Sequence, residues 1–437
     1  MTQRMRIVRI IDRLNIGGPA KHVTWLSAGL DPAQFETSLI AGTVSPHEGD
    51  MTDFAREAGV SLTILKEMGR ELGWRDALVV FKLLRMLWQV KPDIVHTHKA
   101  KAGAVGRAAA WLYKWLTPSI LWFRPRPLAV IHTYHGHIFH SYYSPAKTQI
   151  FVLIERFLAW LVTDRIIVIS EQQRREIHEQ FGIGHAEQFR VVPLGIACDE
   201  AEQLTDVHSL RDEAGVTGKE TVIGVVGRLC AVKNHALLLQ AVAPLFAEPA
   251  YKQGLHLFVI GDGELRQELE TLAQQLHIAD RIVFTGFRSD AVALYQELDL
   301  VALTSLNEGT PLTLIEAMNQ GRAVVATEVG GVVDILGQRQ GSSDGFTIWE
   351  HGVTAPSKDA QTFARALRYL LERPELRREM GQRGRAFVRT KLSRERLLQD
   401  IAGLYQELVF QPFYGIQETA VRYEERFRIR RPWPGDR

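Results

Sequence analysis

The stretch VALTSLNEGTPLTLIEAMNQGRAVVATEVGG, residues Val301 to Gly331, decides the fold of this chain. The apolar run from Asp299 to Thr304 has no polar alternation, which predicts a strand buried on both faces of a parallel sheet. Thr310 and Pro311 are residue types that suit an N-cap and a first helical position, and Gly321 suits a helix end. Strand, helix and strand in this order predict an α/β unit.

Two carboxylates frame the start of this helix. Glu308 lies in the loop after the strand, and Glu316 shares a helix face with Leu312. Ligands of open α/β sheets bind at this carboxyl edge, where helix N–H groups also favour anions. A carboxylate on an apolar helix must be solvated, paired or bound to a ligand, because bare burial is costly. The pair is therefore either two exposed glutamates or part of a ligand site.

The sequence pattern around the two glutamates favours the ligand site. The pattern E-x7-E, followed by Gly330 and Gly331, resembles the signature of retaining, nucleotide-sugar-dependent glycosyltransferases of the GT-B fold, the large family numbered four. The resemblance implies that Glu316 accepts hydrogen bonds from the donor ribose and that Glu308 lies against the donor sugar. The amides after Glu308 would hold sugar hydroxyls and the diphosphate; they belong to Gly309, Thr310, Leu312 and Thr313.

Composition and charge exclude several classes of protein. A chain of 437 residues has room for two domains, and 46% hydrophobic with 23% charged residues is typical of a globular protein. A net charge of +2 is too mild for nucleic acid as the main partner. Cys198 and Cys230 predict neither a disulfide framework nor a zinc site. We see no signal peptide and no apolar span of about 18 residues, so we expect a cytoplasmic protein that does not cross a membrane.

The first strand of the chain ends in a glycine pair. Arg6 to Ile11 predicts a buried strand, after which Gly17 and Gly18 allow close approach of a ligand and Pro19 begins a helix. A plain tight turn would use the same residues. The alternation of strands and helices that follows predicts a parallel sheet with right-handed crossovers. In the family this loop touches the phosphates or the acceptor, so the resemblance places both glycines in the site.

Histidines gather at two neighbouring strand ends, HTH at 96–98 and HTYHGHIFH at 132–140. A zinc site is one interpretation and a polar ligand site is the other. Side chains along a strand point in turn to one face and then to the other, and no carboxylate or cysteine completes a ligand set. We therefore predict no metal. The resemblance implies that His135 lies beside the donor sugar and that His98 and His137 line the acceptor side. A purely structural role at a strand end is the alternative for His98.

A second α/β unit begins with the strand TVIGVVG, which leads into Gly227 and Arg228, with Lys233 at the start of the next helix. A guanidinium and an ammonium beside a helix N-terminus make a diphosphate site on physical grounds. The family uses an Arg and a Lys at this spacing to hold the donor phosphates. The loop at Gly286 and Phe287 resembles its base-binding loop.

The fold class that follows is α/β, with two Rossmann-like domains that face a cleft. We expect an acceptor-binding domain over residues 1–200, completed by a last helix at 393–410 that crosses back to it. The nucleotide-sugar-binding domain is expected over 215–392. The basic tail, 411–437, lies outside the family pattern.

The resemblance implies transfer of a hexosyl or N-acetylhexosaminyl group from a nucleotide diphosphate sugar, expected to be a UDP-sugar, with retention and without a cofactor. The acceptor would be a hydroxyl of a lipid-linked or polysaccharide precursor. Arg228, Lys233 and the helix N-terminus would stabilise the departing diphosphate. Front-side attack is the mechanism usually proposed, without Glu308 as nucleophile. The alternatives are a nucleotide-sugar epimerase or hydrolase and, with support from the tail alone, a nucleic-acid-binding protein.

A stretch between the two histidine motifs suggests where a membrane would be contacted. Trp111, Leu112 and Trp115 can share one helical stripe, and WFRPR follows at 122–126. Tryptophan beside cations is typical of an interfacial membrane contact, and a core helix is the alternative. We predict peripheral binding to the anionic inner face of the cytoplasmic membrane through residues 111–126, with help from the basic tail.

Overall fold

The computed structural model describes residues 4–45, 49–69, 73, 75–118, 124–136, 145–199, 209–216, 220–251, 254–288 and 290–410. Its first sheet has seven parallel strands in the order β3-β2-β1-β4-β5-β6-β7. Apolar residues fill the central strands, as expected where helices cover both faces. The strands are β1 (Met5–Ile11), β2 (Phe35–Gly42), β3 (Leu62–Leu65), β4 (Ile94–His98), β5 (Ala129–Thr133), β6 (Arg165–Val168) and β7 (Phe189–Val191).

Helices cover the two faces of this sheet. The core on one face joins three helices to the strands, namely α3 (Asp76–Val90), α4 (Ala100–Trp115) and α5 (Pro145–Leu161). The other face packs against α1 (Gly18–Ala28) and α2 (Thr52–Glu57). A short helix, α6 (Glu171–Arg174), follows β6, and Ser170 caps it by accepting a hydrogen bond from the Gln173 amide.

The second sheet has the order β10-β9-β8-β11-β12-β15-β14-β13. Its parallel strands are β8 (Thr221–Val226), β9 (Leu255–Ile260), β10 (Ile282–Gly286), β11 (Leu300–Leu303), β12 (Ala323–Thr327) and β15 (Gly352–Ala355). An antiparallel edge, β13 (Arg339–Ser343) and β14 (Phe346–Trp349), was not predicted. The helices are α7 (Leu210–Glu213), α8 (His235–Ala247), α9 (Arg266–Gln275), α10 (Ala291–Leu294), α11 (Leu312–Asn319), α12 (Ala360–Leu371) and α13 (Pro374–Lys391).

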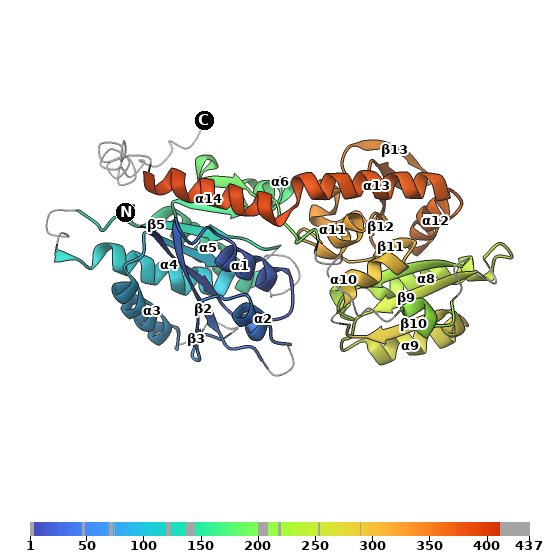
Figure 1. Cartoon of the computed structure of the whole chain (residues 1–437), viewed down its shortest axis with the longest axis horizontal. Coiled ribbons are helices and arrows are strands. Elements are labelled where there is room, and N and C mark those ends of the chain that lie inside the picture. Colours follow the sequence, from blue (N-terminus) through green and yellow to red (C-terminus); the bar gives the residue numbers. More distant parts are fainter. Residues whose placement is uncertain are drawn as a thin grey trace, which may run out of the picture.

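The last described helix, α14 (Arg394–Phe410), returns to the first sheet (Figure 1). Its buried residues Leu397, Ile401 and Leu404 pack in one core with β1 and α1. Tyr405 is fully buried, and its hydroxyl lies 3.2 Å from Nη2 of Arg9 and 2.6 Å from Nδ1 of His96. The predicted crossover is therefore present, and it closes the face of the first sheet that α1 covers only in part.

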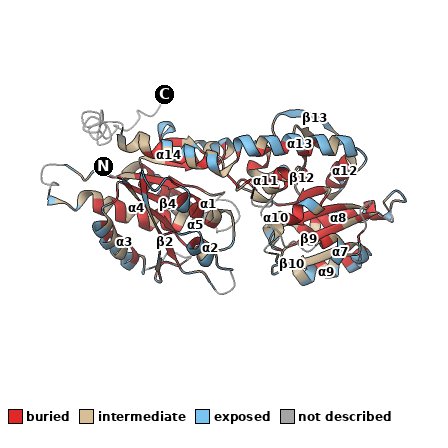
Figure 2. Cartoon of the chain, viewed as in Figure 1, coloured by how far each residue is buried: buried red, intermediate tan, exposed pale blue. Residues whose placement is uncertain are grey.

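Buried residues form a separate layer around each sheet (Figure 2). Both sheets thus belong to doubly wound α/β units, and the predicted fold class is confirmed. Among the described residues, no helix combines the length and the apolar composition needed to span a bilayer.

Candidate active site

The strand orders create one topological switch point in each sheet, between β1 and β4 and between β8 and β11. Ligands of open α/β sheets bind outside the carboxyl ends of the strands at such points. The glycine pair Gly17-Gly18 follows β1 and His98 ends β4. Lys233 follows β8 and Glu308 follows β11. These predicted site residues thus come from the four loops that the topology selects.

The two sets of loops meet at a junction between the domains. An alanine Cβ at Gly18 would lie 2.9 Å from Cδ1 of Leu312, and one at Gly309 would lie 3.0 Å from Cα of Gly136. The ammonium of Lys21, in the first turn of α1, lies 3.2 Å from Oε1 of Glu316 in α11. These glycines therefore let backbone segments of one domain approach the other closely.

Glu308 and Lys233, which are 75 positions apart, form an ion pair. Lys233 Nζ lies 2.5 Å from Glu308 Oε1, and the Ser305 hydroxyl donates to the same oxygen at 2.5 Å. Thr304 donates from its hydroxyl to the carbonyl of Lys233 at 3.1 Å, which joins the end of β11 to the turn that carries the lysine. Lys233 is 24% exposed and Glu308 11%, so the pair is largely shielded from water.

The side chain of Arg228 is more exposed to solvent than that of Lys233. Its side chain is 62% exposed, and Nη2 pairs with Oε2 of Glu264 at 3.1 Å. Gly227, just before it, has a φ of 157°, and a Cβ there would lie 4.0 Å from Cε of Lys233. The loop after β8 therefore brings the lysine over its own backbone, whereas the arginine extends towards solvent.

The start of α11 differs from the prediction. The helix begins at Leu312, with Pro311 as N-cap at ψ 108°, and Thr310 makes no cap hydrogen bond. Proline has no side-chain acceptor, so no side chain caps the first turn. Within the described part of the chain, the buried hydroxyls of Thr310 and Thr313 have no hydrogen-bond partner. The first turn also lacks acids, so free N–H groups and two hydroxyls are available to an anion.

Glu316 is held from two sides. Lys21 contacts Oε1, and the hydroxyl of Tyr295 donates to Oε2 at 3.3 Å. Tyr295 is fully buried, and burial together with the Glu316 carboxylate raises the pKa of its phenol well above the usual value. A carboxylate offers about four lone-pair sites. Two of these remain for hydroxyl donors of a ligand.

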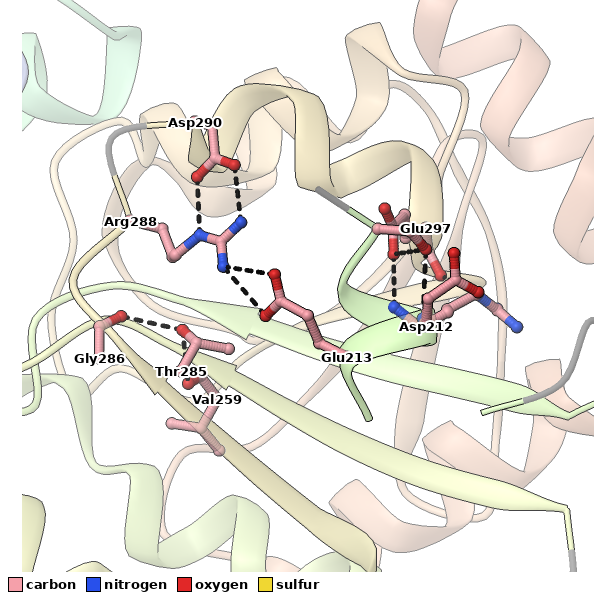
Figure 3. Close-up of polar contacts among 10 residues, drawn as sticks. Asp212, Glu213, Val259, Thr285, Gly286, Arg288, Asp290 and Glu297 are labelled. Carbon is pink, nitrogen blue, oxygen red and sulfur yellow. Dashed lines mark hydrogen bonds and ion pairs between the residues drawn. The ribbon is translucent and has the colours of Figure 1, made fainter. Parts of the chain in front are cut away.

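The loop after β10 is fixed by charge (Figure 3). Arg288 donates from two guanidinium nitrogens to Asp290 at 2.8 Å each, and it also reaches Glu213 at 3.3 Å. The hydrogen bond to Asp290 is the main cause that raises the pKa of Arg288 above its ordinary value. Gly286 has a φ of 72°, and Phe287 beside it is 63% exposed. The ion pairs of Arg288 therefore hold the loop in place while the ring of Phe287 is exposed to solvent.

The structure divides the histidines of the two strand ends between the two faces of the sheet. His98 and His135 come together, with 2.9 Å between Nδ1 and Nε2, and His22 of α1 joins them. One ligand nitrogen from each of the three lies within 4.8 Å of the others, so a third histidine, and not a carboxylate or cysteine, completes a possible ligand set. His132 turns to the other face, towards Thr97. His137 lies outside the described residues.

Sequence reasoning missed His22 and Lys21 because both lie in the helix after the glycine pair, and their partners are distant in sequence. Burial is the largest cause that lowers the histidine pKa values, and Arg9 adds to it for His22 and His98. The pKa of His22 falls to about 3, and that of His135 lies well below the usual value. The cluster is thus neutral at physiological pH, and the positive Arg9 opposes a divalent cation there as it opposes a proton.

We expect this cluster to make the protein sensitive to acid. Unfolded histidines bind protons below about pH 6.5, whereas His22 in the folded protein stays neutral down to about 3. The unfolded state therefore gains protons first, and the free energy of unfolding falls as pH decreases between these values. Each such imidazole contributes about 1.4 kcal/mol per pH unit. Urea unfolding midpoints at a series of pH values check this.

The matched variants are His22→Phe, which should flatten the pH dependence, and His256→Gln, which should leave it unchanged. His256 is a partly exposed histidine paired with Glu220 at 3.1 Å. Equal midpoints for the wild type at pH 5 and pH 7 would contradict neutral burial of the cluster.

Two Rossmann-like domains whose switch-point loops meet around two carboxylates, two lysines and an uncapped helix define a nucleotide-sugar-dependent glycosyltransferase of the GT-B type. The chain belongs to this family. Residues 17–195 match the family model described as glycosyl transferase 4-like domain, and residues 206–387 match the model described as glycosyl transferases group 1.

Two relatives named as glycosyltransferases support the same class. The chain is 26% identical, over 72% of its length and 76% of the relative's, to UDP-Gal:alpha-D-GlcNAc-diphosphoundecaprenol alpha-1,3-galactosyltransferase of Escherichia coli. It is 27% identical to the putative glycosyltransferase EpsD of Bacillus subtilis, over 76% of this chain and 81% of the relative.

Among solved structures, Anabaena HepE in complex with UDP has a TM-score of 0.72 at 20% identity and covers 92% of this chain and 100% of its own. Sucrose-phosphate synthase of Thermosynechococcus elongatus has a TM-score of 0.73 at 20% identity, with 93% and 99% covered. Both share the GT-B fold with this chain.

Proposed function

We propose that this glycosyltransferase moves a hexosyl or N-acetylhexosaminyl group from a UDP-sugar to a hydroxyl of a lipid-linked diphosphate sugar, with retention of the anomeric configuration. The observation that carries the proposal is the shielded Lys233–Glu308 pair beside the uncapped start of α11. A diphosphate needs the cation and the free N–H groups, and a sugar needs the carboxylate.

Each site residue has a part in this scheme. The diphosphate lies between Lys233, Arg228 and the amides from Gly309 onwards, and Glu316 accepts from the ribose hydroxyls. The base lies on the loop of Gly286 and Phe287. His135 adjoins the sugar, since the Gly309 backbone approaches its carbonyl closely. The remaining residues that we assign to donor binding are Gly17, Gly18, Gly227, Thr310, Leu312 and Thr313.

The reaction needs no added oxidant or metal. The acceptor oxygen bonds to the anomeric carbon while the bond from that carbon to the diphosphate oxygen breaks. The acceptor proton passes to the departing phosphate on the same face, which preserves the configuration. Lys233 and the α11 amides stabilise the negative charge that develops, and preorganised donors of this kind supply a large part of catalysis.

The acceptor class is supported by the relatives. The Escherichia coli relative is named for a GlcNAc-diphosphoundecaprenol acceptor, and a Campylobacter jejuni relative, 26% identical over 56% of this chain, is named for a diphospho-undecaprenol acceptor as well. A lipid-linked acceptor places the enzyme at the inner face of the cytoplasmic membrane, without a role for nucleic acid.

The test is a transfer assay with a panel of UDP-sugars and a polyprenyl diphosphate sugar, with and without a chelator. We expect transfer that requires acceptor, an α-linked product from an α-linked donor by nuclear magnetic resonance, and equal rates in the chelator. Donor cleavage that ignores acceptor would indicate a hydrolase, and a changed donor sugar an epimerase. Loss of activity in the chelator would assign a metal to the histidine cluster.

A further inference from the structure

The helical layer on one face of the first domain exposes large apolar side chains. Among the described residues, seven of the eleven exposed large hydrophobics lie on α3, on α5 or directly after α4. Those on α3 are Leu78, Phe81 and Trp88, exposed by 44%, 60% and 40%; those on α5 are Ile150, Leu153 and Phe157, exposed by 57%, 61% and 56%; Leu116 follows α4. Their spacing of three, four and seven positions places each set on one side of its helix.

The two stripes belong to one surface. α3 packs against α4, and α4 against α5, so the three helices form a continuous layer (Figure 1). The opposite sides of these helices are buried, with Leu83, Leu87 and Leu158 in the same core. Partly exposed Trp111 and Leu112 of α4 lie between the stripes. We call the outer side of α3, α4 and α5 the apolar face.

The exposed charges on the three helices of the apolar face have one sign, and Lys82 and Lys114 pair with the neighbouring acids Glu67 and Asp164. The three helices contain two acids, Asp76 and Glu155. Asp76 pairs with Lys101, and buried Glu155 accepts from Arg107 at 2.6 Å. Arg85 and Arg156 are exposed among the apolar side chains. An amphipathic surface with aromatic and aliphatic residues, basic side chains and no outward acid is the composition that lies on anionic lipid.

The structure describes part of the contact predicted at residues 111–126. Trp111 and Leu112 pack against the core rather than projecting freely. Arg126 turns back onto α4, with its guanidinium carbon 4.7 Å from the ring centre of Tyr113 and Nη1 donating to the Tyr113 carbonyl at 3.1 Å. Residues 119–123, which include Trp122, and the tail from 411 lie outside the described residues.

We propose that the apolar face of α3, α4 and α5 docks on an anionic lipid surface, with Phe81, Trp88, Ile150, Leu153 and Phe157 inserted at the boundary of headgroups and acyl chains. The inference rests on the proposed lipid-linked acceptor. α5 returns the chain from the carboxyl edge of β5, where His135 lies, so its first turns lie at the same edge of the sheet as the site. A lipid-linked diphosphate sugar would then reach the junction while its lipid stays in the membrane.

Co-sedimentation with vesicles tests the docking surface. Wild type should bind vesicles that contain phosphatidylglycerol. Its binding should weaken as the salt concentration increases, and it should bind more weakly to vesicles of phosphatidylcholine alone. Ile150→Ser/Leu153→Ser/Phe157→Ser, or Phe81→Ser/Trp88→Ser, should reduce partitioning at least about tenfold, because several apolar side chains leave the lipid boundary. Val191→Ser is the matched control, since Val191 is an exposed apolar residue on β7, 38% exposed and outside the face.

Other outcomes would overturn the proposal. These are a wild type that ignores anionic vesicles, variants that bind as well as wild type, or a wild-type dimer in sedimentation that the same substitutions dissociate. Activity separates this inference from the proposed function. With a short-chain, water-soluble acceptor the α5 variant should equal the wild type, whereas with vesicle-embedded acceptor it should be slower. No transfer to either acceptor by the wild type would refute the acceptor class and leave the vesicle result to decide the surface.

Discussion

Replacement of Lys233 by alanine is expected to lower kcat at least about tenfold, because it removes a cation that stabilises charge on the departing diphosphate. The site is shielded, with Lys233 24% exposed, so water screens this charge less than one at the surface. Arg228→Ala should reduce turnover less, since Arg228 is 62% exposed and already paired with Glu264. Steady-state kinetics with varied donor measure both effects.

The control for Lys233→Ala is Lys82→Ala, which removes an ion pair of similar length, 2.6 Å to Glu67, from the first domain. It should leave kcat unchanged. The melting temperature of each variant separates a loss of fold from a loss of catalysis. Near-normal turnover of Lys233→Ala with an intact fold would remove the lysine from the site.

The second large effect distinguishes the two glutamates. Glu316→Gln should weaken UDP binding about tenfold or more, because a charged acceptor that offers free lone pairs to the ribose becomes an amide. Glu308→Gln should leave UDP affinity nearly intact and lower kcat, since the proposed function assigns this carboxylate to the sugar and not to the nucleotide. Calorimetric titration with UDP measures the change in affinity, and turnover of the UDP-sugar measures the change in kcat.

Lys21→Met extends this test across the junction. Lys21 holds Oε1 of Glu316 from the other domain, so its loss should weaken UDP binding in the same direction as Glu316→Gln. Neither substitution should matter for a UDP analogue that lacks both ribose hydroxyls. Equal UDP affinities for wild type and Glu316→Gln would place the ribose elsewhere, and an effect of Lys21→Met without one of Glu316→Gln would assign the lysine to the diphosphate.

Local patterns predicted much of the second half correctly. The strand before Glu308, the helix after it and the end at Gly321, where φ is 69°, all follow from residue type and spacing. The error at the helix start also has a local cause. Thr310 has the right chemistry for an N-cap, but the backbone turns into the helix one residue later, so its hydroxyl is left for a ligand.

The histidines show the limit of such reasoning. Positions along a strand predict faces, and they correctly separate His132 from His96 and His98. They cannot predict that α1 brings His22 against His98 and His135, because that contact depends on how a helix packs across the end of the sheet. The same holds for the apolar face. The sequence shows that α3 and α5 are rich in hydrophobic residues, but only the packing shows that one side of each helix stays exposed.

The sequence by itself determined the alternation of strands and helices, the crossover helix and the residue types that a nucleotide sugar requires, because these depend on periodicity and on motifs a few residues long. Tertiary structure alone decided which distant residues meet: Lys233 with Glu308, Lys21 with Glu316, and three histidines around one point. Strand order set these contacts by bringing the loops after β1, β4, β5, β8 and β11 to the junction. Strand order is a property of the whole sheet, and no local stretch of the chain encodes it.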